Sequence, residues 1–268
     1  MRDFPLIGNY WPGTSLIHRM DPRAKLLATL ALILIAFTAQ SFAALGVLTL
    51  FTLGVIMVAE LPIRGVLRSI APLIFFSVLT ALLNLFWTQG GEVLVRLGPI
   101  AISEAGVRSA AFFGYRMLVL LVEVSLLTLT TRSLDISEAF ERVGGPLKRL
   151  RVPVHELGMM MGIALRFLPQ LAFEARSIYQ AQLSRGADLT SGRGAARLRG
   201  MGAVIVPLFT GALRHAETLS YAMDARCYHG ADGRTRLHPL TFDRIDLACP
   251  AVLALLLACL LLANLSPW

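Results

Sequence analysis

A run of 34 residues without a charged side chain, from 26 to 59, constrains the fold most. A helix of about 20 apolar residues crosses the ~30 Å hydrocarbon core of a bilayer, so the run is long enough to enter a membrane. As one helix it would extend ~51 Å, which is too long for a single span even when tilted. We therefore predict two short spans of about 17 residues each, with a turn near Gln40 and Ser41.

Three further apolar stretches, at about 70–88, 106–131 and 247–265, are long enough to span a membrane. Only 16% of the residues are charged and 56% are hydrophobic. This composition excludes an ordinary soluble domain, in which about a quarter of the residues are charged. The predicted fold class is an all-α polytopic membrane protein with about five transmembrane helices and long cytoplasmic amphipathic helices.

The distribution of basic residues predicts the orientation. Arg19, Arg23 and Lys25 precede the first span, and Arg64 and Arg68 follow the second. Because basic residues accumulate on the cytoplasmic side, the N-terminus is predicted to be cytoplasmic. The same bias accounts for the net charge of +8. No basic stretch is interleaved with aromatic residues, which argues against nucleic-acid binding.

The chain is predicted to contain four regions. They are a cytoplasmic N-terminal segment (1–25), a four-helix transmembrane region (26–131), a cytoplasmic region (132–246) and a C-terminal transmembrane helix (247–268).

Three helices are expected in the cytoplasmic region. The first opens at Asp135 with a pattern similar to a capping box and stops at Gly144. The second covers about 154–183 and should be kinked at Pro169, and the third covers about 201–225. A solvated basic loop is expected at 188–200, between the second and third helices.

The two longest helices each end in a short basic tripeptide. These tripeptides are Ser184, Arg185 and Gly186 in one helix, and Ala225, Arg226 and Cys227 in the other. Small residues recur along the third helix, a pattern that lets two helix backbones approach closely. We predict two long helices packed against each other, each presenting one arginine to an acidic pocket on a soluble partner.

Several motifs of the chain resemble the transmembrane T component of energy-coupling factor transporters, the EcfT family of vitamin and metal importers. They are residues 8–26 (GNYWPGTSLIHRMDPRAKL), 166–169 (RFLP), 180–186 (QAQLSRG) and 221–226 (YAMDAR). The resemblance extends from residue 8 to about residue 228. Cys227 departs from the pattern, because the family usually has glycine at that position.

The resemblance implies that this chain is the non-catalytic coupling subunit of an ATP-driven importer of micronutrients in the bacterial cytoplasmic (inner) membrane. The two arginine tripeptides would dock into grooves on two cytoplasmic ABC ATPase subunits, which would bind ATP and Mg²⁺, and this chain would bind no cofactor itself. A small membrane substrate-binding subunit, the S component, would dock on the coupling helices. The docking residues expected on the third helix are Gly202, Val204, Leu208, Gly211 and Ala212.

Two other transport mechanisms remain open on the residues alone. Glu123 lies inside the fourth span, where a carboxylate is costly and often functional. It could serve a proton-coupled secondary carrier, although we favour a structural pair with Arg116 on the same helical face. A conventional ABC permease that binds substrate within its own spans is the other alternative.

Enzyme and metal functions find no support in the motifs. The chain has neither the phosphate-binding pattern GxxxxGK[ST] nor the GxSxG pattern of an activated serine. The clustered aspartates of a lipid phosphotransferase are missing, and the five histidines and three cysteines show no metal-ligand spacing.

Overall fold

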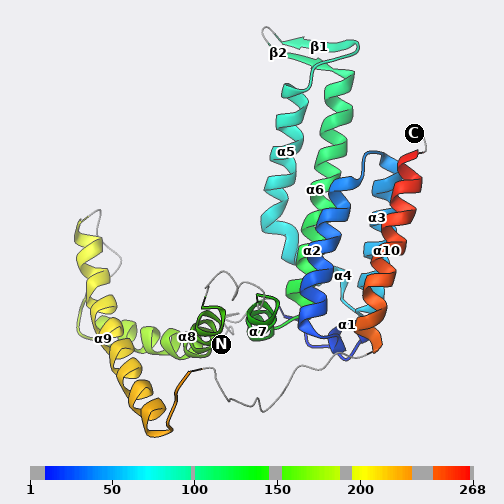
Figure 1. Cartoon of the computed structure of the whole chain (residues 1–268). Helices are drawn as coiled ribbons and strands as arrows, with labels where there is room; N and C mark the ends of the chain where they lie inside the picture. Colours follow the sequence, from blue (N-terminus) through cyan, green and yellow to red (C-terminus); the bar gives the residue numbers. More distant parts are fainter. Residues whose placement is uncertain (1–9, 98–99, 145–152, 188–194, 231–243, 266–268) are drawn as a thin grey trace. The chain divides into compact units, whose positions relative to one another are not determined.

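The computed structural model describes residues 10–97, 100–144, 153–187, 195–230 and 244–265 (Figure 1). The chain divides into two compact units. The membrane unit comprises Gly8–Phe140 and Pro239–Trp268, and the crossed-helix unit comprises Glu141–His238.

The membrane unit is helical apart from one hairpin. Its helices are α1 (Leu16–Arg19), α2 (Pro22–Thr38), α3 (Phe42–Val58), α4 (Ile63–Ile70), the 3₁₀ helix η1 (Ala71–Leu73), α5 (Ile74–Trp87), α6 (Glu104–Thr130) and α10 (Arg244–Leu265). The chain passes from this unit to the other within α7 (Ser133–Val143). Between α5 and α6 the strands β1 (Val93–Leu97) and β2 (Ile100–Ser103) pair in antiparallel fashion. The all-α prediction is confirmed, and the hairpin is an addition to it.

The predicted turn within the long apolar run is confirmed. α2 ends at Thr38 and α3 begins at Phe42. Ser41 is the N-cap of α3, and its side-chain oxygen accepts a hydrogen bond from the backbone N–H of Ala44. Asn264, near the end of α10, holds the turn. Its side chain accepts from the backbone N–H of Gln40 at 2.9 Å and donates to the carbonyl of Thr38 at 2.9 Å.

The predicted spans coincide with helices of the membrane unit. Three stretches among the described residues are long and apolar enough to cross a membrane: Ile63–Trp87, Glu104–Thr130 and Asp246–Leu265. α3 is a shorter apolar helix, and α2 has the same length of 17 residues. The third predicted span begins earlier than expected, because α4, η1 and α5 follow one another without a break.

Two apolar clusters form the core of this unit. The first joins α2, α3, α6 and α10 through residues such as Ala36, Leu45, Val119 and Leu260. The second lies around Ile56 and Leu126 at the other end of α3 and α6. α5 packs on α6, where the side-chain hydroxyl of Ser77 donates to the carbonyl of Gly114 at 2.8 Å. Most large side chains of α5 are exposed, including Phe75, Leu83 and Trp87, as suits a helix that faces lipid.

The predicted pair between Arg116 and Glu123 is wrong. Arg116 instead donates hydrogen bonds to the carbonyls of Ala36, Phe37 and Ala39, at 2.9, 2.6 and 2.8 Å. These carbonyls lie at the C-terminal end of α2, where the helix leaves its last carbonyls without intrahelical donors. Glu123 is 2% exposed, and neither of its carboxylate oxygens has a hydrogen-bond partner among the described residues.

The N-terminal motif ties three helices together at the other end of the membrane unit. The side-chain ammonium of Lys25 donates to the carbonyls of His18 and Thr130, at 3.1 and 3.2 Å. The backbone N–H of Asp21 donates to Asp246 of α10, and that of Trp11 donates to Leu129 of α6, both at 2.9 Å. The motif contains α1 and the first turn of α2.

The crossed-helix unit contains α8 (Val154–Ser184) and α9 (Ala195–Ala225). α8 matches its predicted range to within one residue and continues through Pro169. α9 begins six residues before its predicted start, so the expected basic loop at 188–200 is wrong from Ala195 onward, and its residues 188–194 lie outside the described residues. α7 likewise begins at Ser133, two residues before the predicted capping position.

Candidate functional site

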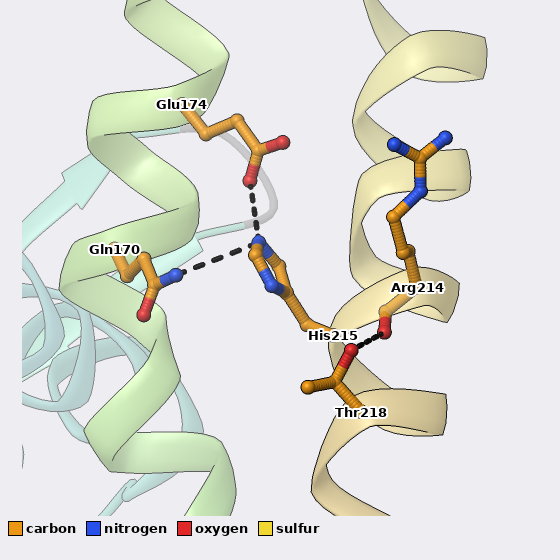
Figure 2. Close-up of polar contacts among 5 residues, drawn as sticks. All are labelled: Gln170, Glu174, Arg214, His215 and Thr218. Atoms are coloured by element: carbon orange, nitrogen blue, oxygen red, sulfur yellow. Dashed lines mark hydrogen bonds and ion pairs between the residues drawn. The ribbon is translucent and has the colours of Figure 1, made fainter.

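α8 and α9 cross each other, and a polar cluster marks the crossing (Figure 1). Figure 2 shows His215 of α9 pointing toward Gln170 and Glu174 of α8. The side-chain nitrogen Nε2 of His215 lies 3.3 Å from Oε2 of Glu174 and 3.5 Å from Nε2 of Gln170. The contact with Glu174 becomes an ion pair when His215 is protonated. The ring of Phe167 lies 6.2 Å from the imidazole, centroid to centroid.

A glycine allows this close approach. A Cβ atom on Gly211 would collide with the carboxylate oxygen Oε1 of Glu174, whereas a Cβ atom on Gly202 would meet nothing within 4 Å. The prediction that the two helices pack against each other is thus confirmed. Of these two glycines, only Gly211 lies at the contact.

The two helices run in opposite directions. The phenol hydroxyl of Tyr228, just beyond α9, donates to the sulfur of Met159 near the start of α8 at 3.0 Å. The start of α8 therefore lies beside the end of α9, and the two arginine tripeptides lie toward opposite ends of the helix pair.

Each arginine lies the same number of residues beyond the crossing on its own helix. Arg185 follows Glu174 by 11 residues (185 − 174), and Arg226 follows His215 by 11 residues (226 − 215). At 1.5 Å per residue each arm is ~16 Å long, so the two arginines lie up to ~33 Å apart.

The first tripeptide, Ser184 to Gly186, ends α8 with a Schellman motif. The N–H of Gly186 donates to the carbonyl of Leu183 at 2.9 Å, and the N–H of Ala187 donates to that of Gln182 at 3.0 Å. Gly186 has a φ of +79°, the left-handed conformation that this motif requires. Arg185 is the C-cap residue.

The second tripeptide, Ala225 to Cys227, ends α9 in the same way. The N–H of Cys227 donates to the carbonyl of Asp224 at 2.9 Å, and the N–H of Tyr228 donates to that of Met223 at 3.1 Å. Cys227 has a φ of +52° and thus takes the left-handed position that Gly186 takes in α8. Glycine would fit this position without strain, because a residue with a Cβ atom is strained in the left-handed conformation.

Both arginine side chains are exposed and have no polar partner among the described residues. Neither guanidinium of Arg185 or Arg226 makes a hydrogen bond or ion pair within the described part of the chain. Each follows the last turn of a long helix, where the backbone carbonyls concentrate partial negative charge that stabilises a nearby cation. The geometry thus presents two matching cations on rigid helix ends.

The predicted docking residues of α9 are half-buried. Gly202, Val204, Leu208, Gly211 and Ala212 all have intermediate exposure. Beside them lies a more exposed apolar stripe at four-residue spacing, which comprises Met201, Ile205, Phe209 and Leu213 with exposed fractions of 47, 54, 63 and 52%.

The residues of the crossing could not be recognised from the sequence. Gln170, Glu174 and His215 are polar residues on amphipathic helices, and their spacing alone does not show which of them face each other. The nearest signal was Gly211, one turn before His215, but small residues recur along α9 and do not show which of them lies at the contact. Among the residues that the structure describes, no three His, Cys, Asp or Glu side chains gather as metal ligands would.

The fold and this site define a helical membrane protein with an apolar helical bundle and a pair of crossed amphipathic helices. The family model described as "Cobalt transport protein" (CbiQ) matches residues 13–237.

Similar relatives carry the name "Energy-coupling factor transporter transmembrane protein EcfT". The relative from Bacillus subtilis is 38% identical over 260 residues, which cover 97% of this chain and 98% of the relative. The relative from Heliobacterium modesticaldum is 43% identical over 242 residues, covering 90% and 91%. The relative from Brevibacillus brevis is 42% identical over 240 residues, also covering 90% and 91%. The chain belongs to the EcfT family of energy-coupling factor transporter transmembrane proteins.

Proposed function

We propose that this chain is the coupling subunit of an ATP-driven importer and transmits the motion of two cytoplasmic ABC ATPases to a substrate-binding membrane subunit. The observation that carries the proposal is the pair of Schellman-capped tripeptides, each with an exposed arginine ~16 Å from one crossing. ATP and Mg²⁺ bind to the ATPases, and this chain catalyses no reaction and binds no cofactor.

The mechanical step follows from the crossing. ATP binding draws the two ATPases together, and their grooves move Arg185 and Arg226. Because both residues cap stiff helices that touch at Glu174 and His215, the displacement changes the crossing angle of α8 and α9. The change in angle tilts the substrate-binding subunit, which releases its cargo toward the cytoplasm.

The docking surface for the substrate-binding subunit lies on α9. It comprises Gly202, Val204, Leu208, Gly211 and Ala212. The exposed apolar side chains next to them, such as Ile205 and Phe209, suit a partner that is itself apolar and embedded in the membrane. The cargo is a micronutrient, a vitamin or a metal ion, and its identity is determined by the substrate-binding subunit.

The membrane in question is the bacterial cytoplasmic membrane, with the N-terminus on the cytoplasmic side. This orientation places Arg19, Arg23 and Lys25, and the two arginines of α4, on the side where basic residues accumulate. It also places the two tripeptides where cytoplasmic ATPases can reach them.

Charge reversal at both tripeptides tests the proposal. A charge-assisted hydrogen bond contributes about 1.5–3 kcal/mol, so the Arg185→Glu, Arg226→Glu double variant should weaken ATPase binding by ~10²–10⁴-fold. The measurement is co-purification of the ATPases with the chain, together with uptake in cells. Arg214→Glu is the matched control, because Arg214 is exposed on α9 and its side chain extends along α9 rather than toward α8 (Figure 2). Undiminished co-purification and uptake in the double variant would refute the proposal.

A proton-coupled carrier is a second candidate, and one observation favours it. Glu123 is a buried carboxylate in a membrane-spanning helix without a hydrogen-bond partner among the described residues, which is the kind of group a proton carrier uses. Coupling by ATPases predicts that Glu123→Gln leaves uptake unchanged at pH 6 to 8. Loss of uptake together with its pH dependence would favour the carrier.

A further inference from the structure

The membrane unit contains a pocket at the end where α2 turns into α3. Its volume is about 610 Å³, and its walls come from the α2–α3 turn, one stripe of α6 and the end of α10. The α6 wall includes Arg108, Phe112 and Arg116, spaced four residues apart on one face of the helix. Gln40 and Ser109 add an amide and a hydroxyl to the lining.

The pocket is positively charged. Among the described residues that line it, two are arginines and none is acidic. Arg116 is held by the three carbonyls of the α2 end, and its guanidinium lies 5.5 Å from the ring centre of Phe112. Backbone carbonyls stabilise this cation without cancelling its charge. Arg108 is exposed and has no hydrogen bond or ion pair within the described residues.

The position of Arg108 calls for a partner outside the chain. The predicted topology places this end of the membrane unit on the external side, where the charge bias of membrane proteins disfavours arginine. Arg108 lies two helical turns (~12 Å) from Arg116, and none of the described residues that line the pocket carries a carboxylate, so the pocket has an excess of positive charge.

We propose that this pocket binds a phosphate group, either in the headgroup of an anionic phospholipid or as free phosphate from the aqueous phase. Guanidinium groups match the geometry of phosphate oxygens and bind them with two parallel hydrogen bonds. Basic pockets between helices on the cytoplasmic or matrix side of a membrane bind lipid headgroups for this reason, and the same chemistry is available to a pocket at the external end. The rings of Phe37 and Phe42, which are 61% and 40% exposed at the pocket, provide apolar surface that an acyl chain covers.

The proposal does not depend on the coupling function. All lining residues belong to the membrane unit, and neither arginine tripeptide takes part. The bound group would join α2, α6 and α10 at their common end, as the N-terminal motif does at the other.

The test compares wild-type protein with Arg108→Gln, using the full chain purified in detergent and stripped of lipid. Native mass spectrometry measures binding of phosphatidylglycerol and of zwitterionic phosphatidylethanolamine. In a lipid-free sample, ³¹P NMR line broadening measures binding of inorganic phosphate. Because Arg108 has no partner within the described chain, its replacement should leave thermal unfolding unchanged while weakening phosphate-group binding about tenfold. Arg64→Gln is the control, because it removes an exposed arginine from α4, outside the pocket.

Preferential binding of phosphatidylglycerol that is lost in Arg108→Gln but retained in Arg64→Gln supports the proposal and identifies the lipid as the source. Broadening of the inorganic phosphate signal with the same dependence on Arg108 supports it and identifies the aqueous anion. The proposal is overturned if neither ligand binds, or if Arg108→Gln binds both as the wild type does.

Discussion

Exchanging the residues at the left-handed positions of the two tripeptides should change the stability of the two helix ends in opposite directions. Cys227 adopts a φ of +52° and Gly186 a φ of +79°, in otherwise equivalent Schellman motifs. A residue with a Cβ atom costs about 1–2 kcal/mol in this conformation. Cys227→Gly removes that strain but adds backbone freedom to the unfolded chain, which offsets about 0.4–1 kcal/mol. The expected net gain is about 0.5–1 kcal/mol for the end of α9.

The reciprocal change, Gly186→Cys, should destabilise the end of α8 by a similar amount. A Cβ atom added at Gly186 meets nothing within 4 Å, so no clash adds to the backbone strain. The two substitutions therefore isolate one physical effect, and each serves as the control for the other.

Hydrogen–deuterium exchange of the purified chain measures the effect. A change of about 0.5–1 kcal/mol corresponds to a 2- to 5-fold change in the protection of the amides that close each motif. Protection should rise at residues 227 and 228 in Cys227→Gly and fall at residues 186 and 187 in Gly186→Cys. If both variants shift protection in the same direction, or if neither shifts it, the argument from left-handed strain is wrong.

Three other contacts are tested by substitution. Gly211→Val places side-chain atoms against Glu174 and should force α8 and α9 apart, which abolishes uptake, whereas Gly162→Val on α8, where an added Cβ atom meets nothing within 4 Å, should retain it. Arg116→Met removes three hydrogen bonds to the α2 end and should lower the unfolding free energy by about 2–4 kcal/mol, measured by thermal unfolding in detergent. A drop below about 1 kcal/mol would contradict the capping role. Tyr228→Phe removes the hydrogen bond to Met159 and should raise amide exchange at the start of α8 by about twofold, with uptake retained.

The membrane spans could be predicted because their signal is local. A bilayer fixes the length of an apolar helix, so the run from 26 to 59 allowed only two helices, and the turn at Gln40 and Ser41 followed. α8 was predicted to within one residue, since its amphipathic period is continuous. The start of α9 was missed because Gly200 suggested a loop. The preceding residues, from Ala195 to Arg199, are strong helix formers and extend the helix through it.

The partners of buried polar groups could not be predicted in the same way. Arg116 and Glu123 lie seven residues apart on one helix, which made a pair plausible. The true partners of Arg116 are backbone carbonyls of α2, and such acceptors have no signature in the sequence. The crossing was hidden for a related reason. Whether His215 meets Glu174 depends on the register and angle of two helices, which small residues permit but do not specify.

The equal arms of the crossed helices have a mechanical consequence. Each arginine lies ~16 Å from the crossing. Equal and opposite forces on the two arginines would therefore rotate the helices about the crossing without displacing it. The contact between Glu174 and His215 then stays in place while the helices rotate around it. If two ATPases act on the arginines as proposed, unequal movements would displace the crossing sideways, whereas a symmetric closure would rotate the apolar surface of α9 without translating it.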